Sequence, residues 1–116
     1  MFDFEKLDTY KKARVFNREI QKLLISQIKI KTNLRDQLSR ASSSILLNIA
    51  EGSGKFTNKD KSRYYRISRG SCYECVAVLD MLMDMELISP TKHNLLYIQL
   101  EEVAKMLTGL IKSLGK

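Results

Sequence analysis

The sequence predicts an all-α fold: one antiparallel, up-down-up-down four-helix bundle over residues 1–116 that assembles as a homo-oligomer. At 116 residues the chain is long enough to bury one core and too short for two domains. With one Pro and five Gly, its composition favours helices joined by short turns. Apolar residues recur at helical spacing in four segments, which is typical of helices that each bury a face.

The first segment, residues 6–28, places its apolar side chains on one face. These side chains are Tyr10, Ala13, Phe16, Ile20, Leu23, Leu24 and Ile28. Charged residues occupy the other faces, so the pattern predicts an amphipathic helix with one buried side. Residues 28–33 are expected to form a connection, with Thr32 or Asn33 as the N-cap of the next helix.

The second segment, residues 34–52, begins with a narrow apolar stripe and then becomes apolar on several sides. The stripe is Leu34, Leu38, Ala41, Ile45 and Ile49, and Leu46, Leu47 and Ala50 point in other directions. One core cannot cover all of these side chains, so we expect a second packing partner. The stretch Gly52-Ser53-Gly54 is expected to end this helix, because glycine is the usual residue of a left-handed C-terminal cap.

The third segment begins near Thr57 or Asn58 and extends to about residue 87. One stripe contains Tyr64, Ser68, Ser71, Cys72, Cys75, Leu79 and Leu82, and a second stripe beside it contains Ile67, Val78 and Met85. So wide an apolar arc predicts burial on two fronts, within the bundle and against another subunit. We expect Tyr64 to lie in the core.

The fourth segment follows the turn Ser89-Pro90-Thr91, because Pro suits the first turn of a helix. Its apolar residues recur to residue 114 as Leu96, Leu100, Val103, Leu107, Leu110 and Leu114. This pattern predicts a helix with one apolar side that closes the bundle. His93, the only histidine, is expected at the surface.

Small and polar residues interrupt the apolar pattern of the second and third helices. The candidate polar network consists of Arg40, Ser44, Asn48, Glu51, Ser71 and Glu74. Asn48 and Glu51 lie one turn apart, as do Ser71 and Glu74, so two neighbouring helices would join them, with Arg40, Arg63 or Arg66 as counter-charges. We interpret the network as a subunit contact. Acid–base catalysis is the alternative, but no nucleophile or second base accompanies the carboxylates.

The net charge of +7 and the pI of about 9.5 favour an anionic partner. The third helix is basic in its first half and acidic in its second, which is opposite to the preference of the helix dipole. With the preceding turn, the basic cluster is Lys55, Lys59, Arg63, Arg66 and Arg69. Two interpretations stay open: the cluster binds phosphates of RNA or DNA, or neighbouring helices or subunits supply the missing negative charges.

Other motifs predict no catalytic residue, metal ligand or cofactor. Cys72 and Cys75 have C-x-x-C spacing, but a tetrahedral metal site needs a second pair, and the redox motif follows a strand. The stretch Gly52-Ser53-Gly54-Lys55 lacks the spacing of a phosphate-binding P-loop. Apolar runs are too short to span a membrane, so we expect a soluble cytoplasmic protein.

Four blocks of sequence, in this order, carry a family resemblance: FEKLDTYKKAR near the start, QLSRASSSILLNIAEG at 37–52, RYYRISRGSCYE at 63–74 and MLTGLIKSL at 106–114. The chain resembles the four-helix-bundle proteins encoded within intervening sequences of bacterial 23S ribosomal RNA genes. It departs from many members at Leu46, where they have Pro, which concerns a local bend in the second helix.

The resemblance implies a homopentamer with no established enzymatic activity. A more distant relative is the accessory variability determinant of diversity-generating retroelements, a basic pentamer that binds nucleic acid and partners a reverse transcriptase. We therefore expect a non-enzymatic bundle protein that binds nucleic acid, with structured RNA as the first candidate. The competing hypothesis is a protein–protein interaction scaffold or an accessory subunit, for example of a reverse transcriptase.

Overall fold

The computed structural model describes residues 1–115, which form four α-helices after one short 3-10 helix. The elements are η1 (Asp3–Lys6), α1 (Asp8–Ser26), α2 (Thr32–Ser53), α3 (Asn58–Asp84) and α4 (Pro90–Leu114). Residues 1–115 contain no strand, and the prediction of an all-α fold with four helices is confirmed.

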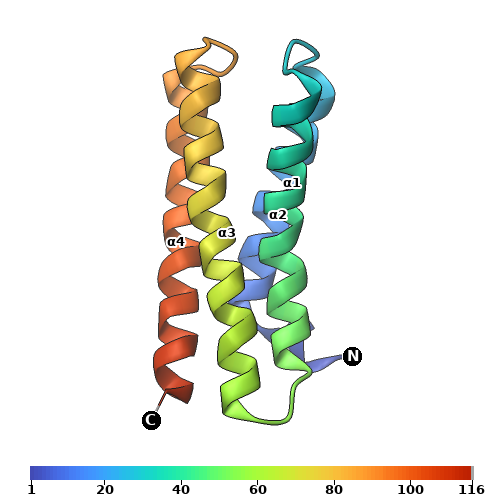
Figure 1. Cartoon of the computed structure of the whole chain (residues 1–116), viewed down its shortest axis with the longest axis vertical. Helices are drawn as coiled ribbons and strands as arrows, with labels where there is room; N and C mark the ends of the chain where they lie inside the picture. The colour runs from blue at the N-terminus through green and yellow to red at the C-terminus, as the bar shows by residue number, and fades with distance from the viewer. Residues whose placement is uncertain (116) are drawn as a thin grey trace.

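The four helices form a rod of 44 × 24 × 21 Å. Each helix packs against two others, in the cyclic order α1, α2, α3, α4, and the most extensive contacts join α2 to α3. The α1–α2 and α3–α4 loops lie at one end of the rod, and the α2–α3 loop and both chain ends lie at the other (Figure 1). Within residues 1–115, no helix combines the length and the apolar character needed to cross a membrane.

The core runs along the axis of the rod and draws on all four helices. Its largest fully buried side chains are Phe16, Ile20, Leu38, Ile45, Ile49, Val78, Leu79, Leu82, Leu96, Leu100, Val103 and Leu107. These are residues of the predicted stripes. Each such side chain stabilises the fold by about 1.5–3 kcal/mol relative to an exposed one, so the core is the main source of stability.

The connection between α1 and α2 differs from the prediction. Helix α1 ends at Ser26, Ile28 is 82% exposed, and Ile30 is buried in its place. The Arg35 guanidinium of α2 donates hydrogen bonds to the carbonyls of Leu24 and Gln27. These bonds satisfy backbone carbonyls at the C-terminal end of α1. The N-cap of α2 is Lys31 and makes no side-chain capping bond, so the prediction of a Thr32 or Asn33 cap was wrong.

The ends of α2 and α3 also differ from expectation. Helix α2 ends within Gly52-Ser53-Gly54 as predicted, with Gly54 as its C-cap, but the φ of Gly54 is −83° and no glycine of residues 1–115 adopts the left-handed conformation. That conformation occurs instead at Glu86, with a φ of 59°, where the chain turns away after α3. Thr57 caps α3 and Ser89 caps α4, where Pro90 is the first residue as predicted.

The missing side chain of Gly52 lets α2 and α3 approach each other closely. A Cβ at this position would lie 2.9 Å from Tyr65 Cε1 and 3.0 Å from Tyr64 Cβ. The Tyr65 ring fills this space and is buried, and its hydroxyl lies 3.1 Å from Ser53 Oγ. Tyr64 is only half-buried, so the prediction that Tyr64 belongs to the core was wrong.

We predict that Gly52→Ala lowers the free energy of unfolding by about 1–3 kcal/mol, because the new Cβ would overlap the Tyr65 ring. Gly70→Ala is the matched control, since it lies inside α3 with no atom within 4 Å of the new Cβ, and it should leave stability unchanged or raise it by up to about 1 kcal/mol. Urea unfolding followed by circular dichroism, at one protein concentration, makes the comparison. Equal stability of the two variants would contradict the close approach.

Candidate nucleic-acid interface

The α2–α3 contact brings together part of the predicted polar network. Ser71 Oγ donates a hydrogen bond to Ser44 Oγ at 2.8 Å, and Asn48 Nδ2 donates to the same oxygen at 3.0 Å. Ser68, which is fully buried and lies one turn before Ser71 on α3, donates from its Oγ to the carbonyl of Ile45 at 2.7 Å. Each hydroxyl in this contact therefore has a partner within the chain, which removes the penalty for burying it.

The charged members of the network do not join this cluster. Glu51 pairs with Lys55 at 3.0 Å along α2, and Glu74 accepts a hydrogen bond of 3.4 Å from Gln37. Arg40 lines a hollow of about 430 Å³ on the α2–α3 face, together with Ser44 and Glu74. Of the three expected counter-charges, Arg40 lies beside Glu74, whereas Arg63 and Arg66 bond to hydroxyl groups. The role of these residues as a subunit contact stays a prediction.

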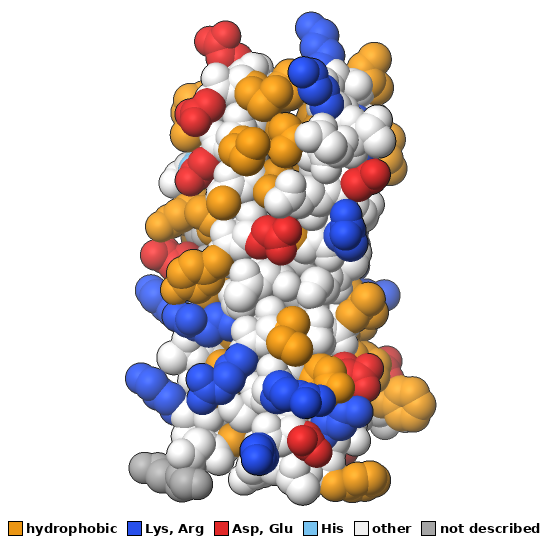
Figure 2. All heavy atoms as spheres, viewed as in Figure 1, with side chains coloured by type: hydrophobic (Ala, Val, Ile, Leu, Met, Phe, Trp, Pro, Cys, Tyr) orange, Lys and Arg blue, Asp and Glu red, His pale blue; other side chains and the backbone are white. Residues whose placement is uncertain are grey.

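Apolar side chains lie beside the polar cluster on the same α2–α3 face. Leu47 is 64% exposed and Ile67 is 46% exposed, one turn from Ser44 and from Ser71 respectively. In Figure 2 hydrophobic side chains are distributed among polar ones over α2 and α3, the helices nearest the viewer. This face thus combines exposed apolar surface with fixed hydrogen-bonding groups.

The basic cluster lies at the end of the rod that carries the α2–α3 loop (Figure 2). Arg63 Nη2 lies 3.5 Å from the Tyr64 hydroxyl, and Arg66 Nε donates to Ser62 Oγ at 3.1 Å. Arg69 donates to Thr108 Oγ1 and to the Tyr73 hydroxyl, both at 2.9 Å. Lys59 is exposed, and Lys55 bonds to Glu51, which raises the pKa of the Lys55 ammonium above its ordinary value.

Within residues 1–115, the three arginines of this cluster form no ion pair with a carboxylate. The neighbouring helix adds positive charge instead, because the second half of α4 brings Lys105 and Lys112 to the same groove. Within the part of the chain that the structure describes, one member of the cluster, Lys55, has a carboxylate partner, Glu51 of α2, so neighbouring helices balance the cluster only in part. That neighbouring subunits supply the remaining negative charge stays a prediction.

Sequence reasoning missed Lys105 and Lys112. They lie within residues 105–115, the second half of α4 and the residue after it, and this stretch contains no acidic residue. Figure 1 shows the second half of α4 beside the first half of α3. Comparing the charges of these two half-helices would have revealed the shared basic groove.

Three hollows follow one another along the α3–α4 groove. The first, about 410 Å³, has Arg69 and Thr108 at one end; the second, also about 410 Å³, shares these two residues and adds Arg66 and Lys112. The third, about 570 Å³, shares Arg66 and adds Arg63. All three hollows are lined by arginines of α3 that form no ion pair within residues 1–115, so the groove presents several cations to one extended anion.

The thiols and the histidine belong to the packing of the bundle. Burial raises the pKa of the Cys72 thiol to about 12, and burial likewise raises the pKa of Cys75. His93 is half-buried, with its side chain 15% exposed and its Nε2 2.6 Å from Oδ1 of the exposed Asp80, so it is less exposed than predicted. No group of three or more His, Cys, Asp or Glu within residues 1–115 is placed to hold a metal ion.

We predict that iodoacetamide modifies Cys72 and Cys75 slowly in the native protein at about pH 8 and rapidly in urea, because the thiolate is the reactive form. Because burial raises both pKa values, the native protein keeps its thiol protons at a pH where the unfolded chain loses them. The resulting contribution to the free energy of unfolding is complete below the ordinary pKa of 9.0 and is lost as the pH rises above it. Ser113→Cys provides an exposed thiol as control. Native modification as fast as at that control would contradict the buried placement.

Comparison with known proteins agrees with this fold. No curated protein matches the sequence. A crystal structure of a protein with unknown function, from the S23 ribosomal protein family of Bacteroides thetaiotaomicron, superposes with a TM-score of 0.83 at 23% identity, covering 90% of this chain and 98% of that chain. At this identity the similarity shows a shared fold.

The family model described as "23S rRNA-intervening sequence protein" matches residues 5–109. That match spans nearly the whole bundle, including the α2 and α3 blocks on which the resemblance was based. The chain therefore belongs to the 23S rRNA-intervening sequence protein family.

Proposed function

We propose that this chain is a non-enzymatic, cytoplasmic, oligomeric protein that binds RNA or DNA through phosphates, using the α3–α4 groove. The observation that carries the proposal is the set of α3 arginines that have no carboxylate partner within residues 1–115. Nucleic-acid phosphates supply the missing charge at regular spacing, and their binding releases condensed counterions. Contacts of this kind set position and affinity without choosing a sequence.

The charge order along α3 supports a ligand. Lys59 and Lys61 lie in the first turn, where the helix dipole is positive, and Asp80 and Asp84 lie near the negative end. Each unfavourable charge near a helix end costs about 0.3–1 kcal/mol. Lys61 donates to the carbonyl of Ser53 at 2.9 Å and so has a partner within the chain, whereas a bound anion would offset the unfavourable charge of the exposed Lys59.

Self-association is the second part of the proposal. We propose an antiparallel four-helix bundle that assembles through its α2–α3 face, as a homopentamer by analogy with the family resemblance. The exposed Leu47 and Ile67 supply apolar area, and Ser44, Asn48 and Ser71 supply fixed polar groups beside it. Cyclic symmetry would then repeat the basic groove around the assembly and place several copies on one nucleic acid.

We predict that the double variant Arg63→Glu and Arg66→Glu abolishes binding to a structured RNA at low salt, because it replaces two cations of the groove with anions. The affinity of the wild type should fall steeply with salt, by a slope of about 0.7–0.9 per phosphate contact on a double-logarithmic plot. Fluorescence anisotropy with a labelled hairpin measures both quantities.

The matched control is Arg14→Glu with Arg18→Glu, which makes the same change in net charge on exposed positions of α1. Circular dichroism checks that both double variants keep their helices. Binding that survives the α3 reversal, or that does not change with salt, would refute phosphate binding at this groove.

For assembly we predict that Leu47→Glu combined with Ile67→Glu lowers the molar mass in sedimentation velocity, because a buried subunit contact does not tolerate two unpaired carboxylates. Ile98→Glu, at an exposed apolar position of α4, should leave the mass unchanged. A wild-type monomer, or a double variant with the wild-type mass, would contradict assembly through α2 and α3.

A protein–protein scaffold remains the second candidate function. The observation that favours it is a further group of exposed apolar side chains on the first half of α4, which are Leu95, Tyr97 and Ile98. These residues also show that α4 has exposed apolar side chains as well as buried ones, whereas the sequence pattern predicted a helix with a single apolar side. An assembly that ignores RNA at low salt would favour this candidate over nucleic-acid binding.

A further inference from the structure

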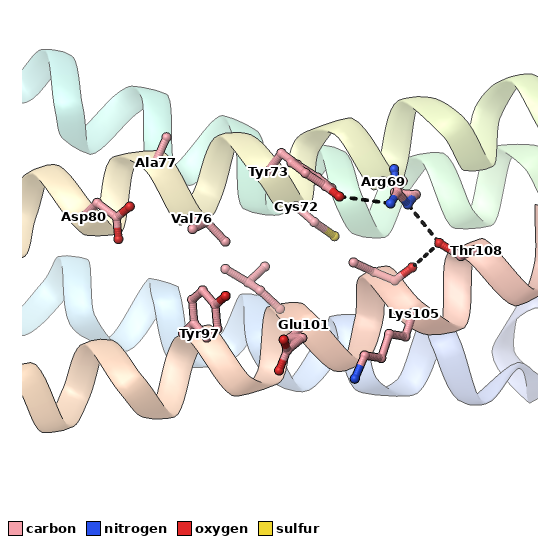
Figure 3. Close-up of a pocket in the computed structure, with 12 residues that line it drawn as sticks. Arg69, Cys72, Tyr73, Val76, Ala77, Asp80, Tyr97, Glu101, Lys105 and Thr108 are labelled. Atoms are coloured by element: carbon pink, nitrogen blue, oxygen red, sulfur yellow. Dashed lines mark hydrogen bonds between the residues drawn. The ribbon is translucent and has the colours of Figure 1, made fainter.

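The first hollow of the α3–α4 groove has the features of a pocket for a flat, uncharged ring. Small and apolar side chains line it, among them Val76, Ala77 and Ala104. Tyr73 of α3 and Tyr97 of α4 are 59% and 40% exposed and line the hollow from its two helices, Tyr73 beside Arg69 and Tyr97 nearer to Asp80 (Figure 3). Its volume of about 410 Å³ lies within the range of small-molecule sites, about 300–1,000 Å³.

A fixed cation closes one end of this hollow. Arg69 donates to Thr108 Oγ1 and to the Tyr73 hydroxyl, and Thr108 Oγ1 donates in turn to the carbonyl of Ala104 at 3.0 Å (Figure 3). The Arg69 guanidinium also lies 5.0 Å from the centre of the Tyr73 ring. An arginine held in this way loses little entropy when it binds a phosphate.

A carboxylate lies at the other end. Asp80 occupies this end and is already bonded to His93, and Glu101 lies on α4 between Tyr97 and Lys105 (Figure 3). Carboxylate oxygens repel a phosphate and accept hydrogen bonds from the exocyclic amino groups of bases. The hollow is therefore polarised along its length, with the end for an anion at Arg69 and the end for a base edge at Asp80.

We propose that this hollow binds one unpaired nucleotide, with its base against Tyr73 and Tyr97 and its phosphate on Arg69. The proposal rests on the proposed function, because the strand continues from Arg69 along the next hollow, past Arg66 and Lys112. A base paired inside a duplex has no free face to offer these rings, whereas an unpaired base stacks on them whatever its sequence. The ligand class is thus single-stranded segments of nucleic acid, including the loops of a structured RNA.

The test compares three labelled ligands with equal labelling by fluorescence anisotropy: a single strand of about 12 nucleotides, an abasic strand of the same length, and a blunt duplex. The abasic strand keeps every phosphate and lacks the bases. The wild type should bind the intact strand at least about fivefold more tightly than the abasic one, which corresponds to about 1 kcal/mol of stacking. Ribose and deoxyribose versions of the strand distinguish RNA from DNA.

Side-chain variants locate the effect. Tyr97→Ala and Tyr73→Ala should reduce the affinity for the intact strand to that for the abasic strand, and Tyr97→Phe should restore it, because a phenyl ring still stacks. Ile98→Ala, an exposed neighbour on α4, should change nothing. Circular dichroism confirms folding of each variant, and the comparison of ligands on the wild type needs no variant at all.

The outcomes separate this proposal from the function on which it rests. Equal wild-type affinity for the intact and abasic strands would overturn the nucleotide pocket and leave phosphate binding standing. A loss of preference at Ile98→Ala, with none at the two tyrosines, would also overturn it. Failure to bind any of the three ligands at low salt would refute the proposed function itself.

Discussion

Helices α2 and α3 approach each other at a contact made of Gly52, serines and one tyrosine, and the rest of the molecule depends on that approach. A side chain at Gly52 would occupy the space of the Tyr65 ring, and Ser44, Ser68 and Ser71 find their partners only because the two backbones are close. Leu47 and Ile67 of the same two helices are exposed. Helices α2 and α3 therefore supply both the close inner contact and the exposed face that we assign to self-association.

Helix α3 contributes residues to both the α2–α3 face and the α3–α4 groove. Its Ser68 and Cys72 lie in the core, Ile67 and Ser71 face the α2 side, and Arg66 and Arg69 face α4. A single helix 27 residues long thus connects the proposed assembly face to the basic groove. The proposed assembly through α2 would leave the α4 side open to a ligand, so the two proposed activities would not compete for one surface.

The helical pattern was enough to predict four helices and nearly all of their core residues, because burial follows the spacing of apolar side chains. The errors lie where a contact between distant residues decides the outcome. The spacing of apolar residues placed Tyr64 in the buried stripe of α3, whereas Tyr65 is the buried tyrosine and its ring fills the space left by the missing side chain of Gly52. Ile28 depends on where α1 ends, which the Arg35 hydrogen bonds set.

The candidate site shows the same division. The α3 cations follow from the sequence, since they occupy one stretch, but the partners of Arg69 do not. Thr108 comes from another helix, and only the packing of α3 on α4 brings its hydroxyl to the guanidinium. His93 is likewise drawn to Asp80 by that packing. The sequence does not show which half of one helix packs against which half of another. The order of the helices along the chain restricts this pairing only coarsely.

The most direct test of the central claim is light scattering coupled to size exclusion, performed on the wild-type protein alone and then with a structured RNA at low and at high salt. The account predicts an oligomer that takes up RNA at low salt and releases it at high salt, with the protein mass unchanged by the salt. An oligomer that ignores RNA at low salt would contradict the assignment of the basic groove, and a monomer would contradict assembly through α2 and α3.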